Sequence, residues 1–192
     1  MCIRDRDKPE GDDPVTLYRM MKTSVERFSD QPLFGYVPAE GMPRSHITYG
    51  EFADLVDAVA SGMVSRGVVA GDRIALIVDN SVEWAATALA ANAVGALYTA
   101  MYTQQRGKEW AYILGDSTPS MVVVANTAVL DKLVEAMPDD ASAWPANGIV
   151  LLGEDEANEV PPEGIEVVNW SAFVQAGRAA DALGEVADDP MA

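Results

Sequence analysis

Cysteine and histidine are almost absent from this sequence of 192 residues. Cys2 is the single cysteine, so the chain cannot form an internal disulfide or a cysteine metal cluster, and this usage is typical of a reducing compartment. His46 is the single histidine, which excludes a metal cluster built from histidines. It falls beside a predicted strand, where we expect a structural or solvent-facing role and not a catalytic one.

Cations and long apolar runs are scarce as well. Thirteen Lys and Arg against thirty Asp and Glu give a net charge of −17. Binding to nucleic acid or to an anionic membrane surface depends on cations, so both partners are disfavoured. The nearest approach to a membrane span, residues 84–97, is too short and contains Thr87 and Asn92. The N-terminus has no apolar signal core, so we expect no transmembrane segment and a cytoplasmic location.

The usual signatures of nucleotide-binding and hydrolase sites are missing too. No G-x-G-x-x-G fingerprint, G-x-x-x-x-G-K-[ST] phosphate loop or G-x-S-x-G nucleophile elbow occurs. The acidic residues 154–159 lack the glycine and the ligand spacing of a calcium loop, so we interpret them as a solvated turn. Composition and spacing alone therefore predict an α/β domain and no particular reaction.

What the sequence does contain is a strand–helix–strand pattern in residues 71–102. Arg73 to Val78 has the length and branching of a strand, and residues 79–81 have the short polar side chains that cap a helix. An alanine-rich helix then runs to Gly95 and a second strand follows. This pattern predicts a right-handed unit with parallel strands. Trp84 is the bulky residue of the helix, and its burial would make Trp84→Ala cost about 3–5 kcal/mol.

Residues before this unit predict an N-terminal helix, a β-hairpin and a second helix. Thr16 caps the first helix, and its apolar residues fall on one side: Leu17, Met20, Met21, Val25 and Phe28. Residues 33–37 and 45–49 alternate as two strands of a hairpin. Thr48 and Glu51 have the spacing of a capping box, which starts a helix that ends at Gly67.

Residues after Tyr102 predict further alternation of helices and strands. We expect a polar loop at 103–106, a helix that ends at Gly115, a strand at 121–125 and a helix from Asn126 or Thr127 to Pro138. Strands at 149–152 and 165–168 follow, and then a helix capped by Ser171 that extends to Leu183. This order favours a mostly parallel sheet with helices on both faces.

Both ends of the chain differ from the rest. We expect residues 1–13 to be a disordered or non-native leader, since residues 1–6 fit nothing downstream. Residues 14–192 are expected to form a partial domain, because the sequence stops at Ala192 without a helix cap or a packed terminus. A sheet that lacks its remaining strands exposes an apolar edge, so we expect the isolated chain to aggregate or to be marginally stable.

Several segments, in order, resemble the AMP-forming acyl-CoA synthetases of the adenylate-forming superfamily. Residues 47–52 (I-T-Y-G-E-F) are similar to its T-Y-x-E-L motif, residues 71–75 (G-D-R-I-A) to its G-D-R-V-A run, residues 80–84 (N-S-V-E-W) to its N-S-x-E-W motif and residues 92–98 (N-A-V-G-A-L-Y) to its K-A-G-A-x-Y motif. Trp170-Ser171, with a helix ending near Gly177-Arg178, resembles the long-chain fatty acid branch. The family has a proline where this chain has Ala100-Met101.

This resemblance implies the incomplete N-terminal part of the large adenylate-forming domain. It implies a ligase that uses ATP and Mg²⁺ to convert a carboxylic acid, here a long-chain fatty acid, into an acyl-adenylate, and then coenzyme A to release AMP. The family's phosphate-binding loop, ribose-binding aspartate, hinge and catalytic lysine all follow the point where this chain ends. We therefore name no catalytic residue and expect the fragment to be inactive, without tight cofactor binding and in need of the remainder of its domain.

One weak site and one alternative function remain open. Tyr102, Thr103, Gln104 and Arg106 follow the end of a predicted parallel strand, and the resemblance implies that coenzyme A passes near this loop. An ordinary polar surface loop explains the same residues. The alternative to the ligase fragment is a free-standing α/β module that binds or regulates without catalysis.

Overall fold

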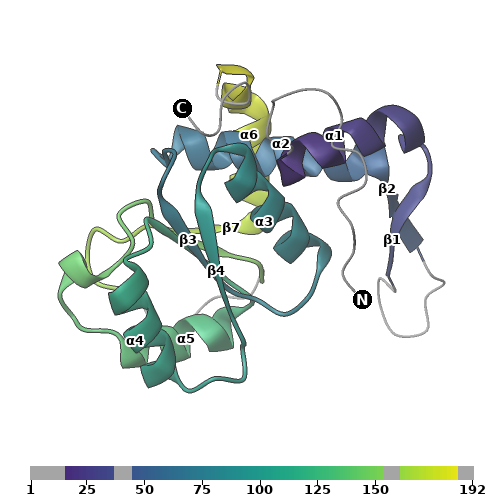
Figure 1. Cartoon of the computed structure of the whole chain (residues 1–192). Helices are drawn as coiled ribbons and strands as arrows, with labels where there is room; N and C mark the ends of the chain where they lie inside the picture. Colours follow the sequence, from purple (N-terminus) through teal and green to yellow (C-terminus); the bar gives the residue numbers. More distant parts are fainter. Residues whose placement is uncertain (1–15, 37–44, 154–160, 186–192) are drawn as a thin grey trace, which may run out of the picture.

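A computed structural model describes residues 16–36, 45–153 and 161–185 (Figure 1). The predicted leader, the acidic turn at 154–159 and the last residues of the chain lie outside these ranges. The described residues form an N-terminal helix and hairpin followed by a five-stranded sheet between two helical layers. Within these ranges no helix has both the length and the hydropathy needed to cross a membrane.

The N-terminal helix and hairpin lie against α2, the longest of the described helices. Helix α1 (Leu17–Phe28) starts where the Thr16 hydroxyl accepts a hydrogen bond from the backbone N–H of Arg19. Strands β1 (Pro32–Tyr36) and β2 (Ser45–Thr48) pair antiparallel, as the sequence predicted. Helix α2 (Tyr49–Ser65) begins with the predicted capping box between Thr48 and Glu51.

The buried side of α1 differs from the prediction. Tyr18 and Met21 are buried, whereas Leu17, Met20 and Phe28 are each about half exposed. A polar contact explains this orientation. The Tyr18 hydroxyl donates a hydrogen bond to the Asp57 carboxylate of α2 at 2.8 Å, and this bond holds the Tyr18 side of α1 against α2. The Lys22 ammonium contacts the same Asp57 carboxylate, so Lys22 lies on the side of α1 that faces α2, together with Tyr18 and Met21.

All five strands of the main sheet run parallel, in the order β4-β3-β5-β6-β7. The strands are β3 (Arg73–Ile77), β4 (Leu97–Met101), β5 (Met121–Val124), β6 (Ile149–Leu151) and β7 (Val167–Asn169). The helices that connect or follow them are α3 (Val82–Ala93), α4 (Gly107–Ser117), α5 (Thr127–Ala136) and α6 (Trp170–Ala180). Two short 3₁₀ turns, Ala141–Ala143 and Ala182–Glu185, complete the described elements. The predicted parallel α/β fold is confirmed.

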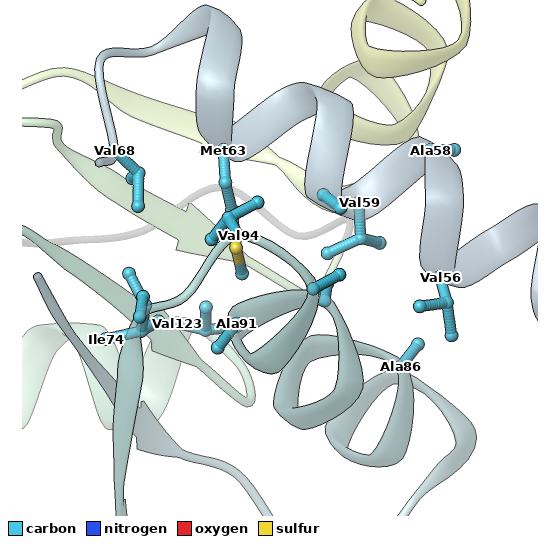
Figure 2. Packing of buried hydrophobic residues seen from close by; sticks show 14 of the residues in the cluster. Val56, Ala58, Val59, Met63, Val68, Ile74, Ala86, Ala91, Val94 and Val123 are labelled. Carbon is cyan, nitrogen blue, oxygen red and sulfur yellow. The ribbon is translucent and has the colours of Figure 1, made fainter. Parts of the chain in front are cut away.

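Helices cover both faces of the sheet, as predicted. Helices α2, α3 and α6 lie on one face, and α4 and α5 on the other (Figure 1). Side chains of β3 alternate between them, so that Ile74 and Leu76 enter the first core and Ala75 and Ile77 the second. Figure 2 shows the first core, where α2, α3 and the strands meet through small and branched side chains.

Predicted boundaries in α4, β7 and α6 were wrong, each for a local reason. Helix α4 continues past Gly115 to Ser117, because the left-handed residue that ends it is Thr118. Helix α6 starts two residues earlier than predicted, because its cap is Asn169 and not Ser171: the Asn169 side chain accepts a hydrogen bond from the N–H of Ala172. It ends at the left-handed Asp181 before Leu183, and the preceding strand is correspondingly shifted to Val167–Asn169.

Candidate functional site at the carboxyl edge of the sheet

The strand order creates a switch point between β3 and β5. From β3 the chain moves outward to β4 and then returns across β3 to β5. In open parallel sheets, ligands bind beyond the carboxyl ends of the strands at such a point. A small cavity of about 300 Å³ lies there, and its lining comes from the ends of three strands and from the starts of α3 and α6: Val78, Asp79, Ser81, Glu83, Ala125, Leu152 and Trp170.

This cavity is acidic. Asp79 and Glu83 supply its charged groups, and the Ser81 hydroxyl accepts the backbone N–H of Trp84 as the cap of α3. Two carboxylates at the start of a helix oppose an anionic ligand there, although the helix dipole alone would favour one. Of residues 79–81, Ser81 has the predicted capping role. Because the cavity is acidic, it does not fit the phosphates of a nucleotide.

The sequence-predicted site residues lie beside this cavity in the loop after β4. The Thr103 hydroxyl donates to Asp79 at 2.7 Å, which joins this loop to the end of β3. The Gln104 amide donates to the Thr103 hydroxyl at 3.2 Å, and the Tyr102 ring is 77% exposed. The structure thus brings Tyr102, Thr103 and Gln104 together at the carboxyl edge, with the Tyr102 ring presented to solvent.

Arg106 is already occupied by an intramolecular partner. Its guanidinium contacts the Glu109 carboxylate in the first turn of α4, and the Nε–Oε1 distance is 2.9 Å. The hydrogen bond from this guanidinium lowers the pKa of the Glu109 carboxyl below its usual range. An incoming phosphate must therefore compete with Glu109, and solvent makes that exposed pair weak enough to be displaced.

Three residues that the sequence did not single out hold the loop in place. The Gln105 side chain accepts the Tyr102 N–H at 3.0 Å, and the Trp110 indole donates to the Tyr102 carbonyl at 3.1 Å. The Lys132 ammonium of α5 donates to the Gln105 carbonyl and lies 4.4 Å from the centre of the Trp110 ring. One feature of the sequence points to this role of Lys132. It follows Val129 by three residues and so lies at the margin of the apolar side of α5, within reach of neighbouring elements.

A larger hollow lies between the hairpin and the start of α3. It has a volume of about 1060 Å³ and apolar walls that include Phe34, Leu55 and Trp84. Trp84 is partly buried here, and its ring contacts the Tyr98 ring edge-on with 6.0 Å between the centroids, so the burial on which the expected cost of Trp84→Ala depended is incomplete. Its ring meets the hollow because α3 packs on the sheet through alanines, which leaves the indole outside that contact.

The charged lining of this hollow is of mixed sign. Arg178, Glu51 and Glu83 supply its charged groups, and the Glu51 carboxylate accepts the Thr48 N–H at the cap of α2. Across residues 16–36, 45–153 and 161–185 no group of three or more metal-ligating side chains gathers. The described residues therefore offer a shaped carboxyl edge and an apolar hollow, but no assembled set of reacting groups.

Comparisons with known proteins agree on one family. The family described as AMP-binding enzyme matches residues 21–181. The long-chain-fatty-acid–CoA ligase ACSBG2 of Rattus norvegicus is 24% identical over 89% of this chain and 24% of its own length. The L-proline–[L-prolyl-carrier protein] ligase of Streptomyces coelicolor is 32% identical over 69% of this chain and 24% of its own length. The chain thus spans about a quarter of the length of these curated relatives.

Solved structures support the same fold. The A-PCP didomain of the carboxylic acid reductase from Segniliparus rugosus, in complex with AMP, superposes with a TM-score of 0.68. It is 15% identical, and the match covers 88% of this chain and 27% of that one. At this identity the likeness shows the fold alone. Together with the family match, it confirms the resemblance that the ordered motifs indicated.

Proposed function

Because this chain belongs to the AMP-binding enzyme family, we propose that it forms the N-terminal part of an ATP-dependent, AMP-forming ligase that activates a carboxylic acid. In the proposed first step the carboxylate attacks ATP to give an acyl-adenylate and pyrophosphate. In the second step the thiol of coenzyme A displaces AMP and forms the thioester. The observation that carries this proposal is the family match across residues 21–181, in which the ordered motifs lie.

We propose a long-chain fatty acid as the substrate. The support is the similarity to the rat long-chain ligase and the segment from Trp170 to Arg178, which resembles that branch. A second candidate is an amino acid transferred to a carrier protein, which the higher identity to the Streptomyces ligase favours. The two candidates differ in both the acid and the thiol acceptor, so one assay can separate them.

Within such a ligase, the described residues act as a scaffold. The complete enzyme would use ATP, Mg²⁺ and coenzyme A, but the carboxyl edge of this sheet carries Asp79 and Glu83 where a triphosphate would need donors. No reaction step is therefore assigned to these side chains. We propose that the chain alone is inactive and that it works only with the remainder of its domain, in the cytoplasm.

We propose further that the loop after β4 faces coenzyme A. Tyr102 offers an exposed side chain, and Arg106 offers a side chain that is 70% exposed and pairs with Glu109. In the full-length ligase, Arg106→Ala should raise the KM for coenzyme A while the KM for ATP stays constant. Lys108→Ala is the matched control, since Lys108 is an exposed cation two residues away. An unchanged KM for coenzyme A in Arg106→Ala would leave the loop an ordinary surface turn.

The substrate is tested with the protein translated from the whole reading frame. Fatty acids of graded length and the twenty amino acids are offered with ATP, and the acyl-adenylate is trapped with hydroxylamine. We expect hydroxamate from long-chain fatty acids and a thioester with coenzyme A. Activity with an amino acid and a carrier protein would select the second candidate. A frame that stops at residue 192 and a protein inert with every acid would support the free-standing, non-catalytic module instead.

A further inference from the structure

The loop after β4 contains a turn that side chains of two helices hold at both ends. Residues 102–105 form this turn, which closes with a hydrogen bond from the Gln105 N–H to the Tyr102 carbonyl at 3.2 Å. The carbonyl of each end residue accepts a further hydrogen bond from a helix. The Trp110 indole of α4 donates to the Tyr102 carbonyl at 3.1 Å, and the Lys132 ammonium of α5 donates to the Gln105 carbonyl.

The hydrogen bond from Lys132 acts directly before Arg106. The Gln105 carbonyl belongs to the peptide group that joins Gln105 to Arg106, and Arg106 is the cap residue of α4. The backbone of α4 also lies close to α5 here, since a Cβ on Gly107 would lie 2.7 Å from the Ala136 Cβ and 2.9 Å from the Lys132 carbonyl. The position of Arg106 is therefore set by the contact between these two helices.

The Lys132 side chain is held on a second side as well. It is partly buried, and its ammonium lies 4.4 Å from the centre of the Trp110 ring, which is itself fully buried. A lysine on a protein surface usually keeps its ammonium in water and remains mobile. A cation that stacks on a buried ring and bonds to a carbonyl has fewer arrangements. All of these contacts join groups within residues 102–136 of this chain.

We propose that Lys132 and Trp110 are positioning residues for the second step of the proposed ligase reaction. They hold the turn so that the side chains of Tyr102 and Arg106 are presented together to coenzyme A, and they act through these side chains. This inference rests on the proposed function of the loop after β4. When one of the two hydrogen bonds is lost, the turn spends less time in the arrangement that binds, and the apparent affinity falls by that fraction.

Steady-state kinetics of the full-length ligase test this role. Lys132→Met keeps the aliphatic stem on the Trp110 ring and removes the donor to the Gln105 carbonyl. We expect the KM for coenzyme A to rise about twofold to tenfold, the effect of one hydrogen bond on an equilibrium. The kcat at saturating coenzyme A and the exchange of pyrophosphate into ATP should stay unchanged, because the exchange reports a step without coenzyme A.

Two further variants separate the donor from the packing. Lys132→Arg keeps a donor and the charge, so it should restore most of the affinity for coenzyme A. Trp110→Phe keeps a ring in the core and removes the donor to the Tyr102 carbonyl, so it should raise the same KM. Trp110→Phe also carries the test if Lys132→Met does not fold.

Lys22→Met is the matched control on the other side of the sheet. The Lys22 ammonium donates to the Asp57 carboxylate at 2.8 Å and lies 5.6 Å from the centre of the Tyr18 ring, so this variant loses the same kinds of contact as Lys132→Met. Because α1 has no part in the loop after β4, Lys22→Met should leave the KM for coenzyme A unchanged.

The outcomes distinguish this inference from the proposed function of the loop. If Arg106→Ala leaves the KM for coenzyme A unchanged, both fail together. If Arg106→Ala raises this KM but Lys132→Met and Trp110→Phe do not, the loop still serves coenzyme A and the positioning role is overturned. Pyrophosphate exchange that falls in step with the rise in KM, or a Lys132→Arg variant as impaired as Lys132→Met, would also overturn it, since either result indicates a general loss of packing.

Discussion

The two faces of the sheet are built in different ways. On the face of α2, α3 and α6, backbones approach closely through small residues, and an ideal Cβ on Gly177 of α6 would lie 1.9 Å from the Ala58 carbonyl of α2. On the face of α4 and α5, the fully buried Trp110 fills the core, and polar ties connect it and Lys132 to the loop after β4. The first face therefore fixes the architecture, whereas the second face sets the position of the candidate site.

The largest expected effect is the difference in the free energy of unfolding between Trp110→Ala and Trp84→Ala. Trp110 is fully buried on the second face, so Trp110→Ala should lower the free energy of unfolding by about 3–5 kcal/mol. Trp84 is partly buried at the edge of the first face, and Trp84→Ala should cost less, about 1–2 kcal/mol, because part of its surface stays in contact with solvent. Urea denaturation of both variants measures the difference. Equal losses would contradict the difference in burial between the two tryptophans.

The close approach of α6 to α2 gives the next effect. Gly177→Ala forces its methyl group into the Ala58 carbonyl and should lower the free energy of unfolding by about 1–3 kcal/mol. Gly115→Ala is the control, because a Cβ there meets nothing within 4 Å and alanine favours a helix by about 1 kcal/mol. Thermal unfolding should therefore shift in opposite directions for the two variants. A neutral Gly177→Ala would show that the helices can separate without loss.

A smaller effect concerns the hydrogen bond from Lys132 of α5 to the Gln105 carbonyl in the loop after β4. Lys132→Met keeps the aliphatic stem over Trp110 but removes the donor to the Gln105 carbonyl, which should cost about 1 kcal/mol. Hydrogen exchange should become faster at the amides of the loop and stay unchanged in α2. Lys108→Met, at an exposed position of α4, should change neither quantity. If loop exchange in Lys132→Met matches the unmodified chain, the loop does not depend on this lysine.

The smallest effect is an exposed ion pair that depends on pH. The Arg66 guanidinium donates two hydrogen bonds to Glu166, at 3.1 and 2.8 Å, and these bonds lower the pKa of the Glu166 carboxyl. A carboxyl with a lowered pKa in the folded state stabilises the fold above its unfolded pKa, and this contribution is lost as pH falls through the folded pKa.

Glu166 is largely exposed, so screening by solvent limits the pair to about 0.5 kcal/mol. The difference in unfolding free energy between the unmodified chain and Glu166→Gln should therefore be present near pH 7 and vanish in acid. A difference that grew as the pH fell would have the wrong sign for this pair.

The sequence predicted those parts of the fold that local chemistry determines. The hairpin, the capping box at Thr48 and Glu51, the order of strands and helices, and the two-sided sheet are all confirmed. Each depends on neighbouring residues or on a periodicity. The family followed from the same segments, because five short motifs occur in order along the chain.

Contacts between distant segments could not be predicted in this way. Tyr18 turns α1 through Asp57, thirty-nine residues away, and Lys132 reaches Gln105 over twenty-seven. The partly buried state of Trp84 depends on how closely the alanines of α3 approach the sheet, which no helical periodicity gives. The candidate site was located from strand ends alone, whereas the groups that hold its loop come from the neighbouring helices α4 and α5.

The central proposal is that this chain supplies the scaffold of an adenylate-forming ligase and not its reacting groups. Exchange of labelled pyrophosphate into ATP, with and without added carboxylic acids, measures the first step directly. We predict no carboxylate-dependent exchange by the 192-residue chain, under conditions in which the protein from the whole reading frame exchanges readily. Exchange by the chain alone that required a carboxylic acid would contradict the account.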